Sequence, residues 1–169
     1  MEITRRGEEL VLRKRPRSLA GAYELLAGLS KDFLKSDAIS VDTDICIYIA
    51  KRKPAGVFAR LERLRPGDVG MSVVTYFELV YGAYKSQQVE ANVARIKQLS
   101  RLIPVQALDA PAATHYGKLR AGLEKSGLLT GAYDLLIAAH ALALGLTLVT
   151  NHVREFPRVP GLSLENWAD

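Results

Sequence analysis

The chain has 169 residues, of which 49% are hydrophobic and 24% are charged, and its formal net charge is +5. This is the composition of a globular domain and excludes a collagen-like, coiled-coil or intrinsically disordered chain. The single cysteine, Cys46, excludes a disulfide within the chain and a zinc site built on cysteine pairs. We find no signal-peptide pattern and no apolar stretch of ~18–20 residues, so we expect a cytoplasmic protein outside the membrane.

The first 37 residues differ in pattern from the rest of the chain. A weak apolar alternation around Arg6-Gly7-Glu8 predicts a short hairpin, and a basic linker follows at 13–17. Helical spacing then predicts a helix over 19–29, with one apolar stripe formed by Leu19, Tyr23 and Leu26. We therefore divide the chain into an appendage, 1–37, and a main domain, 38–169.

From Ala38 onward, apolar segments with strand and helix patterns alternate. The pattern predicts strands at 38–41, 69–72, 103–108, 146–150 and 162–164. It predicts helices at 45–50, 54 to about 65, 74–84, 89–102, 112–125 and 133–144. Because parallel strands need crossover helices, this alternation predicts an α/β fold in three layers, with a mostly parallel central sheet covered on both faces.

Four acidic residues fall at one edge of this predicted sheet. Asp42 closes the first strand, and Glu78 lies early in the helix that follows the second strand. Asp134 opens the helix at 133–144, and Glu155 follows the strand that ends at 150. Ligands of open parallel sheets bind beyond the carboxyl ends of the strands. The fold is therefore expected to bring these four distant acids together.

Converging carboxylates favour a metal-dependent reaction. Two carboxylates ~4 Å apart repel by roughly 4 kcal/mol at an effective dielectric of ~20, so a cluster needs protons or a cation. Oxygen ligands select hard cations such as Mg²⁺ or Mn²⁺. These ions activate water and neutralise the charge that develops on a phosphodiester during its cleavage. The hydroxyls of Thr43 and Thr150 stand beside the acids. The alternative is that each acid separately stabilises a helix N-terminus or is a surface charge.

Five motifs between residues 38 and 167 resemble the VapC-type toxins, which are PIN-domain ribonucleases of bacterial toxin–antitoxin pairs. In chain order they read VDTDICIY (41–48), SVVTYFELVYG (72–82), YDLLIAAH (133–140), LVTNHVREF (148–156) and VPGL with ENW (159–167). The resemblance implies an Mg²⁺- or Mn²⁺-dependent endoribonuclease that forms a homodimer, cleaves tRNA or other structured RNA and arrests growth.

The resemblance also implies roles for particular residues. The catalytic and metal-binding acids would be Asp42, Glu78, Asp134 and Glu155, and the supporting residues would be Thr43, Asp44, Thr150, Asn151 and His152. Two positions depart from the family pattern, since Asp44 replaces the Asn of the DTN motif and His152 replaces the second Asn of TNN. Asp44 adds a negative charge, and His152 adds a titratable nitrogen ligand. Both departures bear on the metal preference.

The appendage resembles the second half of a VapB-type antitoxin. The matching segments are EITRRG (2–7), LVL (10–12), RSL (17–19) and KDFL (31–34). The chain would thus be an antitoxin fragment joined to its toxin, with a cognate antitoxin as a further partner. The first half of the antitoxin's DNA-binding domain has no counterpart, so we do not expect this chain alone to bind operator DNA. The expected contacts with a toxin domain, in cis or in trans, are Tyr23, Leu26, Phe33 and Lys35.

Basic residues are the candidates for RNA contact. Lys51, Arg52 and Lys53 follow the first helix of the main domain, and Arg154 lies beside Glu155. The positive net charge permits nucleic acid as a partner without establishing it. The alternatives are a solvated helix end for the first three residues and an ion pair with Glu155 for Arg154. The core is expected to hold Cys46, His140 and Trp167.

Two other functions compete with an active ribonuclease. In one, the fused antitoxin fragment silences the toxin, and the chain acts as a binding partner. In the other, Asp42 and Asp44 are the nucleophile and the acid of an aspartate-dependent phosphatase. That reaction needs a downstream lysine and a paired-acid motif after a late strand, where the sequence instead has Asn151 and His152.

Overall fold

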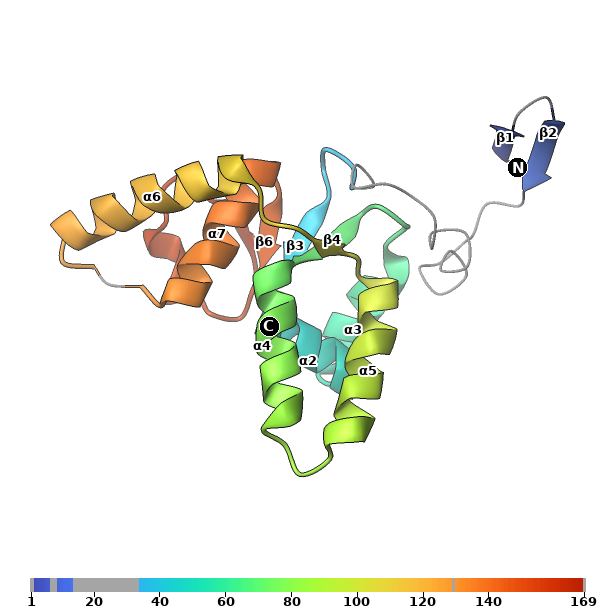
Figure 1. Cartoon of the computed structure of the whole chain (residues 1–169), viewed down its shortest axis with the longest axis horizontal. Coiled ribbons are helices and arrows are strands. Elements are labelled where there is room, and N and C mark those ends of the chain that lie inside the picture. The colour runs from blue at the N-terminus through green and yellow to red at the C-terminus, as the bar shows by residue number, and fades with distance from the viewer. Residues whose placement is uncertain (1, 7–8, 14–33, 129, 169) are drawn as a thin grey trace.

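The main domain is built on a five-stranded parallel sheet with the order β5-β4-β3-β6-β7 (Figure 1). The computed structural model describes residues 2–6, 9–13, 34–128 and 130–168. The strands of this sheet are β3 (Ile39–Val41), β4 (Val69–Ser72), β5 (Val105–Gln106), β6 (Thr147–Val149) and β7 (Leu164–Glu165). Each neighbouring pair is parallel, which confirms the predicted α/β fold.

Helices connect these strands much as the apolar spacing predicts. They are α2 (Thr43–Lys51), α3 (Ala55–Arg63), α4 (Val73–Tyr84), α5 (Val89–Leu102), α6 (Ala110–Lys125) and α7 (Ala132–Leu144), with a short 3₁₀ helix, η1 (Phe156–Arg158). The strand predicted at 103–108 is wrong in length. Ile103 is the buried C-cap that follows α5, and only Val105 and Gln106 pair with β4. A short run of buried apolar residues can belong either to a helix end or to a strand. The run at 103–108 therefore resembles a strand in the sequence.

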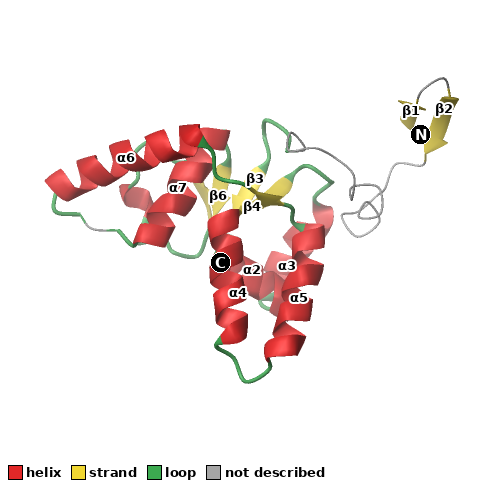
Figure 2. Ribbon diagram, viewed as in Figure 1, coloured by secondary structure: helices red, strands yellow, loops and turns green. Residues whose placement is uncertain are grey.

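Helices pack against the sheet (Figure 2), and an apolar core lies on each of its two faces. Val41 and Val149, neighbours in the β3–β6 register, face the core formed with α2, α3 and α5. Leu148, one residue along β6, faces the core formed with α7 and η1. Successive strand residues point to opposite faces, so this alternation produces the three predicted layers. No helix in the described ranges is long and apolar enough to cross a membrane.

The described part of the appendage is a hairpin of β1 (Glu2–Arg6) and β2 (Glu9–Arg13), as the alternation predicts. The predicted helix at 19–29 lies outside the described residues, as do Tyr23, Leu26 and Phe33. The antitoxin resemblance therefore stays a prediction.

Lys35 contacts the main domain at the amino end of β4. Its ammonium group pairs with Asp68, and its backbone N–H donates to the Gly67 carbonyl at 2.9 Å. Leu34 lies so close to Gly70 that a Cβ there would come within 2.9 Å of a Leu34 methyl group. Lys35 thus contacts the main domain at the opposite end of the strands from the acids, and its antitoxin-like role stays a prediction.

Trp167 is buried, as predicted, in the core that also holds Val41 and Ile45. We expect Trp167→Ala to lower the free energy of unfolding by about 3–5 kcal/mol, because it leaves a large cavity. Trp167→Phe should cost much less, because within the described residues the indole N–H has no hydrogen-bond partner to lose. Urea unfolding followed by circular dichroism measures both. Equal losses for the two variants would contradict a packing role.

Candidate active site

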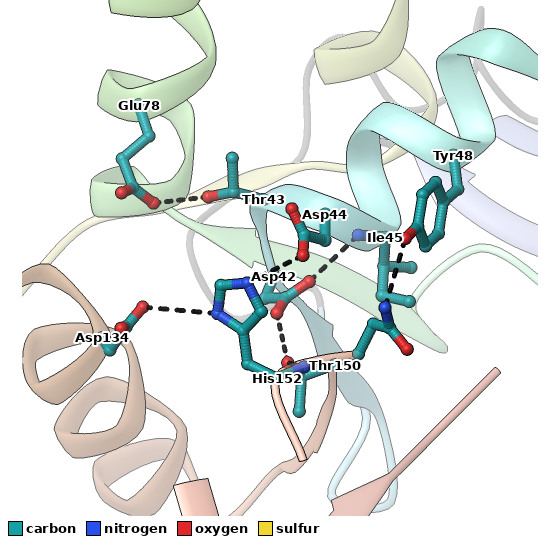
Figure 3. A network of polar contacts seen from close by, with 10 residues as sticks. Asp42, Thr43, Asp44, Ile45, Tyr48, Glu78, Asp134, Thr150 and His152 are labelled. Atoms are coloured by element: carbon teal, nitrogen blue, oxygen red, sulfur yellow. Dashed lines mark hydrogen bonds and ion pairs between the residues drawn. The ribbon is translucent and has the colours of Figure 1, made fainter. Parts of the chain in front are cut away.

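Asp42 stands where β3 gives way to α2 and is the N-cap of that helix (Figure 3). Its carboxylate accepts the Ile45 N–H at 3.0 Å and a hydrogen bond from the Thr150 hydroxyl. The same Thr150 oxygen accepts the His152 N–H at 2.9 Å. Since β3 and β6 are neighbours, Thr150 beyond the end of β6 reaches Asp42 beyond the end of β3. Of the two threonines that the sequence places beside the acids, Thr150 therefore donates its hydroxyl to Asp42.

Burial makes the charge of Asp42 costly. Only 3% of the residue is exposed, and burial raises its pKa from 3.8 to about 6, with a further contribution from the charge of Asp44. The hydrogen bonds from Ile45 and Thr150, and the charge of His152, lower the pKa in part. The ionised form of the Asp42 carboxylate would therefore be stabilised by a nearby positive charge.

Glu78 joins the site from α4. Its carboxylate accepts a hydrogen bond from the hydroxyl of Thr43, the first residue of α2. Ser72 caps α4 by accepting the Val74 N–H at 3.1 Å, which fixes where this helix begins beyond β4. Helix α4 begins at the end of β4 and carries Glu78 in its second turn. Glu78 therefore lies beside the start of α2 (Figure 3).

His152 lies between two acids from different helices. Its Nε2 is 2.8 Å from Asp44 Oδ2, and its Nδ1 is 4.0 Å from Asp134 Oδ1. The ring also stacks on Phe156, with centroids 6.4 Å apart and planes inclined by 20°. Figure 3 shows the imidazole between α2 and α7, close to Asp42. The sequence suggested His152 as a supporting residue but gave no sign that it joins these two helices.

Asp134 lies in the first turn of α7 and is half-buried. Burial raises its pKa above 3.8, and the charges of Glu78, Glu155 and Asp44 raise it further, whereas His152 lowers it. Each of these groups is near enough to act on Asp134. Three of the four predicted acids, Glu78, Asp134 and Glu155, therefore share one electrostatic neighbourhood with Asp44.

An open pocket of about 430 Å³ lies beside Asp134. Asn151, His152, Val153, Arg154 and Glu155 complete its lining. Glu155 caps η1 and pairs with Arg158 at 3.7 Å, so the ion pair of Glu155 is with Arg158 and not with its neighbour Arg154. Asn151 donates to the Tyr48 hydroxyl at 3.2 Å, which ties this loop to α2. Tyr48 is a site residue that sequence reasoning missed.

The donor set suits a hard divalent cation, although the present arrangement does not form its coordination shell. The four predicted acids offer oxygen ligands only, and two of them, Asp42 and Asp134, have pKa values raised by burial and by the charges of nearby acids. Within the described ranges, however, no three His, Cys, Asp or Glu side chains lie close enough to hold one ion. The residues therefore fit a cation by their chemistry, and the side chains must move to bind it.

The basic cluster predicted to contact RNA lies away from the acids. Lys51, Arg52 and Lys53 are exposed at the far end of α2, and Asp42 caps its start. At 1.5 Å per residue, nine residues separate the two ends by roughly 14 Å. Arg52 lies over the Phe58 ring at 4.8 Å. Of the predicted basic residues in this set, Arg154 alone lines the pocket.

Comparison with known proteins identifies the family. The PIN domain model matches residues 39–162, which is most of the chain. The chain belongs to the PIN-domain family. It is 48% identical over 128 residues to the tRNA(fMet)-specific endonuclease VapC of Shigella flexneri, an alignment that covers 76% of this chain and 96% of the relative. It is 39% identical to ribonuclease VapC2 of Rickettsia felis, covering 75% and 96%.

Solved structures place the chain in the VapC group of PIN domains. VapBC2 from Rickettsia felis, bound to a DNA fragment from its promoter, superposes with a TM-score of 0.73 at 37% identity, covering 77% of this chain and 98% of that one. VapBC-1 from nontypeable Haemophilus influenzae gives 0.72 at 37% identity, covering 78% and 99%. The chain is thus a VapC-type ribonuclease of a toxin–antitoxin system, and the phosphatase alternative gains no support.

His140 and Cys46 are buried core residues of this PIN domain, as predicted. His140 Nδ1 lies 2.9 Å from the hydroxyl of Ser72, and burial lowers the pKa of the imidazole. Burial raises the pKa of the Cys46 thiol well above its usual value, which keeps it in the unreactive thiol form. Neither side chain is a member of the acid site.

The raised pKa of Asp42 predicts a pH-dependent cost to stability. The folded protein keeps this proton up to about pH 6, whereas an unfolded aspartate loses it near 3.8. The folded state therefore binds more protons in this window, and stability falls as pH rises through it. In EDTA at pH 7.5, Asp42→Asn should raise the free energy of unfolding by up to roughly 3 kcal/mol. The gain should vanish at pH 4.

Urea unfolding at both pH values measures this effect. Asparagine is as good an N-cap as aspartate, so the helix start is preserved. Asp109→Asn is the matched control, because Asp109 also caps a helix, α6, but is exposed. The control should change little at either pH. A loss of stability for Asp42→Asn at pH 7.5 would show that the carboxylate contributes more through its hydrogen bonds than it costs by burial.

Proposed function

We propose that this chain is an Mg²⁺- or Mn²⁺-dependent endoribonuclease toxin that cleaves tRNA, with Asp42, Glu78, Asp134 and Glu155 as its catalytic acids. The observation that carries the proposal is the electrostatic coupling of Asp134 to acids from three other elements. Acids from distant segments, held close at a cost to stability, are typical of a site built for a cation. Membership of a family of ribonucleases agrees with this chemistry.

The four acids have two roles in the proposed reaction. Asp42 and Asp134 would hold the cation, and a bound cation would supply activation of water and charge neutralisation at the phosphate. Glu78, oriented by Thr43, and Glu155, beside Arg158, complete the acidic rim. Thr150 keeps the Asp42 carboxylate aligned. Arg154 in the pocket is placed to contact an RNA phosphate.

The proposed substrate class is tRNA. Two relatives, from Shigella flexneri and Salmonella typhimurium, are named tRNA(fMet)-specific endonucleases and are 48% and 40% identical to this chain. Exposed aromatic rings stand next to two of the acids in the chain, since Phe77 precedes Glu78 and Tyr133 precedes Asp134. Unpaired bases of an RNA loop stack on rings of this kind. A homodimer and a cognate VapB-type antitoxin are the proposed protein partners.

Replacement of Asp134 by Asn tests the nuclease. We expect Asp134→Asn to reduce cleavage of total tRNA in Mn²⁺ buffer at least roughly 100-fold, since a central charge is lost from the site. Its circular dichroism spectrum should be unchanged. Asp37→Asn, at an exposed position before β3, is the matched control and should cleave normally. Cleavage by the Asp134→Asn variant at the wild-type rate would refute the assignment.

Trimming the appendage tests whether it restrains the nuclease. The cut belongs after residue 33, because Leu34 and Lys35 contact the main domain and their loss would itself disturb β4. We expect the chain that begins at Leu34 to cleave tRNA several-fold faster than the full chain. If restraint acts in trans, dilution should activate the full chain, and if it acts in cis, its specific activity should not depend on concentration. Equal rates for the two chains would exclude restraint. A full chain that never cleaves, beside an active trimmed chain, would support the silenced fusion.

A further inference from the structure

The loop at 151–155, which lines the open pocket, has little burial of its own. Residues 152–154 in its middle are exposed, so hydrogen bonds rather than packing must fix their position. The far end of the loop is anchored, because Glu155 is the N-cap of η1 and the next residue, Phe156, is fully buried in the core formed with α7. The contacts at the near end therefore decide where the exposed residues of the pocket lie.

The near end of this loop is tied to α2 by the Asn151 side chain. The Asn151 amide donates to the hydroxyl of Tyr48 at 3.2 Å. The backbone carbonyl of Asn151 accepts the Val153 N–H at 2.9 Å, so a shift of Asn151 also shifts the turn that follows it. The next residue is Arg154, which lines the pocket. Tyr48 is thus coupled to Arg154 through Asn151 and this turn.

Helix α2 presents Tyr48 toward the loop. Tyr48 follows Asp44 by one helical turn, so the two side chains share a face of α2. Asp44 Oδ2 lies 2.8 Å from the ring Nε2 of His152, which belongs to the same loop. Side chains of a helix lean toward its N-terminus. Figure 3 shows the hydroxyl end of Tyr48 pointing from α2 toward the loop that follows Thr150. One face of α2 therefore runs along the near end of the loop.

Packing holds the Tyr48 ring in place beneath its hydroxyl. The side chain is half-buried and packs against the core that holds Val41 and Ile45. Removal of the hydroxyl alone should leave this packing intact. The bond to Asn151 joins an amide to a hydroxyl, so it contains none of the carboxylates of the site. Its contribution can therefore be measured without a change to any acid.

We propose that Tyr48 is a positioning residue for RNA binding, whose hydroxyl holds Asn151 and so keeps Arg154 where an RNA phosphate meets the pocket. This inference rests on the proposed function, which gives Arg154 that contact. It assigns a role in substrate affinity to a side chain that the sequence did not mark as part of the site.

The catalytic acid of this loop depends less on Tyr48. Glu155 is held from the other side, by the buried Phe156 that follows it and by the pair with Arg158 at 3.7 Å. Loss of the Tyr48 hydroxyl should therefore weaken substrate binding and leave the catalytic step nearly unchanged.

Steady-state cleavage of total tRNA by the full chain in Mn²⁺ buffer tests this role. Tyr48→Phe should raise KM about fivefold, the cost of one ordinary hydrogen bond, with kcat within about twofold of wild type. Tyr76→Phe is the matched control and should change neither constant. Tyr76 is also half-buried against the same core, but its hydroxyl has no hydrogen-bond partner among the described residues. A wild-type KM for Tyr48→Phe would overturn the inference, as would a loss confined to kcat.

A double-mutant cycle tests whether Tyr48 acts through Asn151. Asn151→Ala should itself raise KM, and Tyr48→Phe should have no further effect in that background. A packing defect would instead add to the effect of Asn151→Ala. A further rise of about fivefold in the double variant would thus show that the hydroxyl acts by another route, and it would overturn the inference.

Amide hydrogen exchange separates this inference from the proposed function. In EDTA, where cleavage plays no part, Tyr48→Phe should speed exchange of the Val153 N–H in the full chain about fivefold by NMR, because the turn opens more often. Tyr76→Phe should leave that rate unchanged. Equal exchange in Tyr48→Phe and wild type would overturn the inference and leave the nuclease intact. An absence of tRNA cleavage by wild type would overturn the nuclease, and the exchange rate would then still decide whether Tyr48 holds the loop.

Discussion

Repulsion between carboxylates held at one edge of the sheet is the constraint on which the site depends. Asp42 is buried and Asp134 is half-buried, and both have raised pKa values. Burial removes water from their carboxylates, and the negative charges of neighbouring acids raise the pKa values further. The protein offsets part of this cost with hydrogen bonds from Thr150 and Ile45 and with the charge of His152. A bound cation would offset the part of this cost that these contacts leave. That unfavourable free energy is the physical source of the proposed metal affinity.

The parallel sheet is what makes such a costly arrangement stable. β3 lies between β4 and β6, so that the segments leaving three adjacent strands meet beyond their carboxyl ends. Two apolar cores, one on each face, hold the sheet and its helices in place. Their burial stabilises the fold by an amount that a cluster of surface charges could not supply. The acids can therefore remain close without a permanent partner.

The appendage meets the domain at the other end of the same strands. Lys35 and Leu34 contact Asp68 and Gly70, at the amino end of β4, whereas the acids lie beyond the carboxyl ends. β3 itself spans only three residues, or roughly 10 Å, between the two edges. A segment that precedes residue 34 must therefore fold back along the domain, or reach a second molecule, before it can cover the acids.

The sequence by itself determined the order of the elements, and the bounds of α5 agree with the predicted range of 89–102. Helical and strand periods are local properties, so a single segment reveals them. The sequence also placed four acids at one edge, because the ends of parallel strands follow from the alternation. It gave β5 too many residues and named Lys35 as a contact without placing it at the edge opposite the acids.

Only the tertiary structure decided which side chains meet. Thr150 and Asp42 are hydrogen-bonded across 108 positions of sequence, and Asn151 and Tyr48 across 103. The contacts of His152 with Asp44 and Asp134 likewise join segments that share no local pattern. Such contacts depend on strand register and on the direction of each helix start. Strand register and helix direction are set by packing over the whole domain, so they cannot be predicted from a short stretch of sequence.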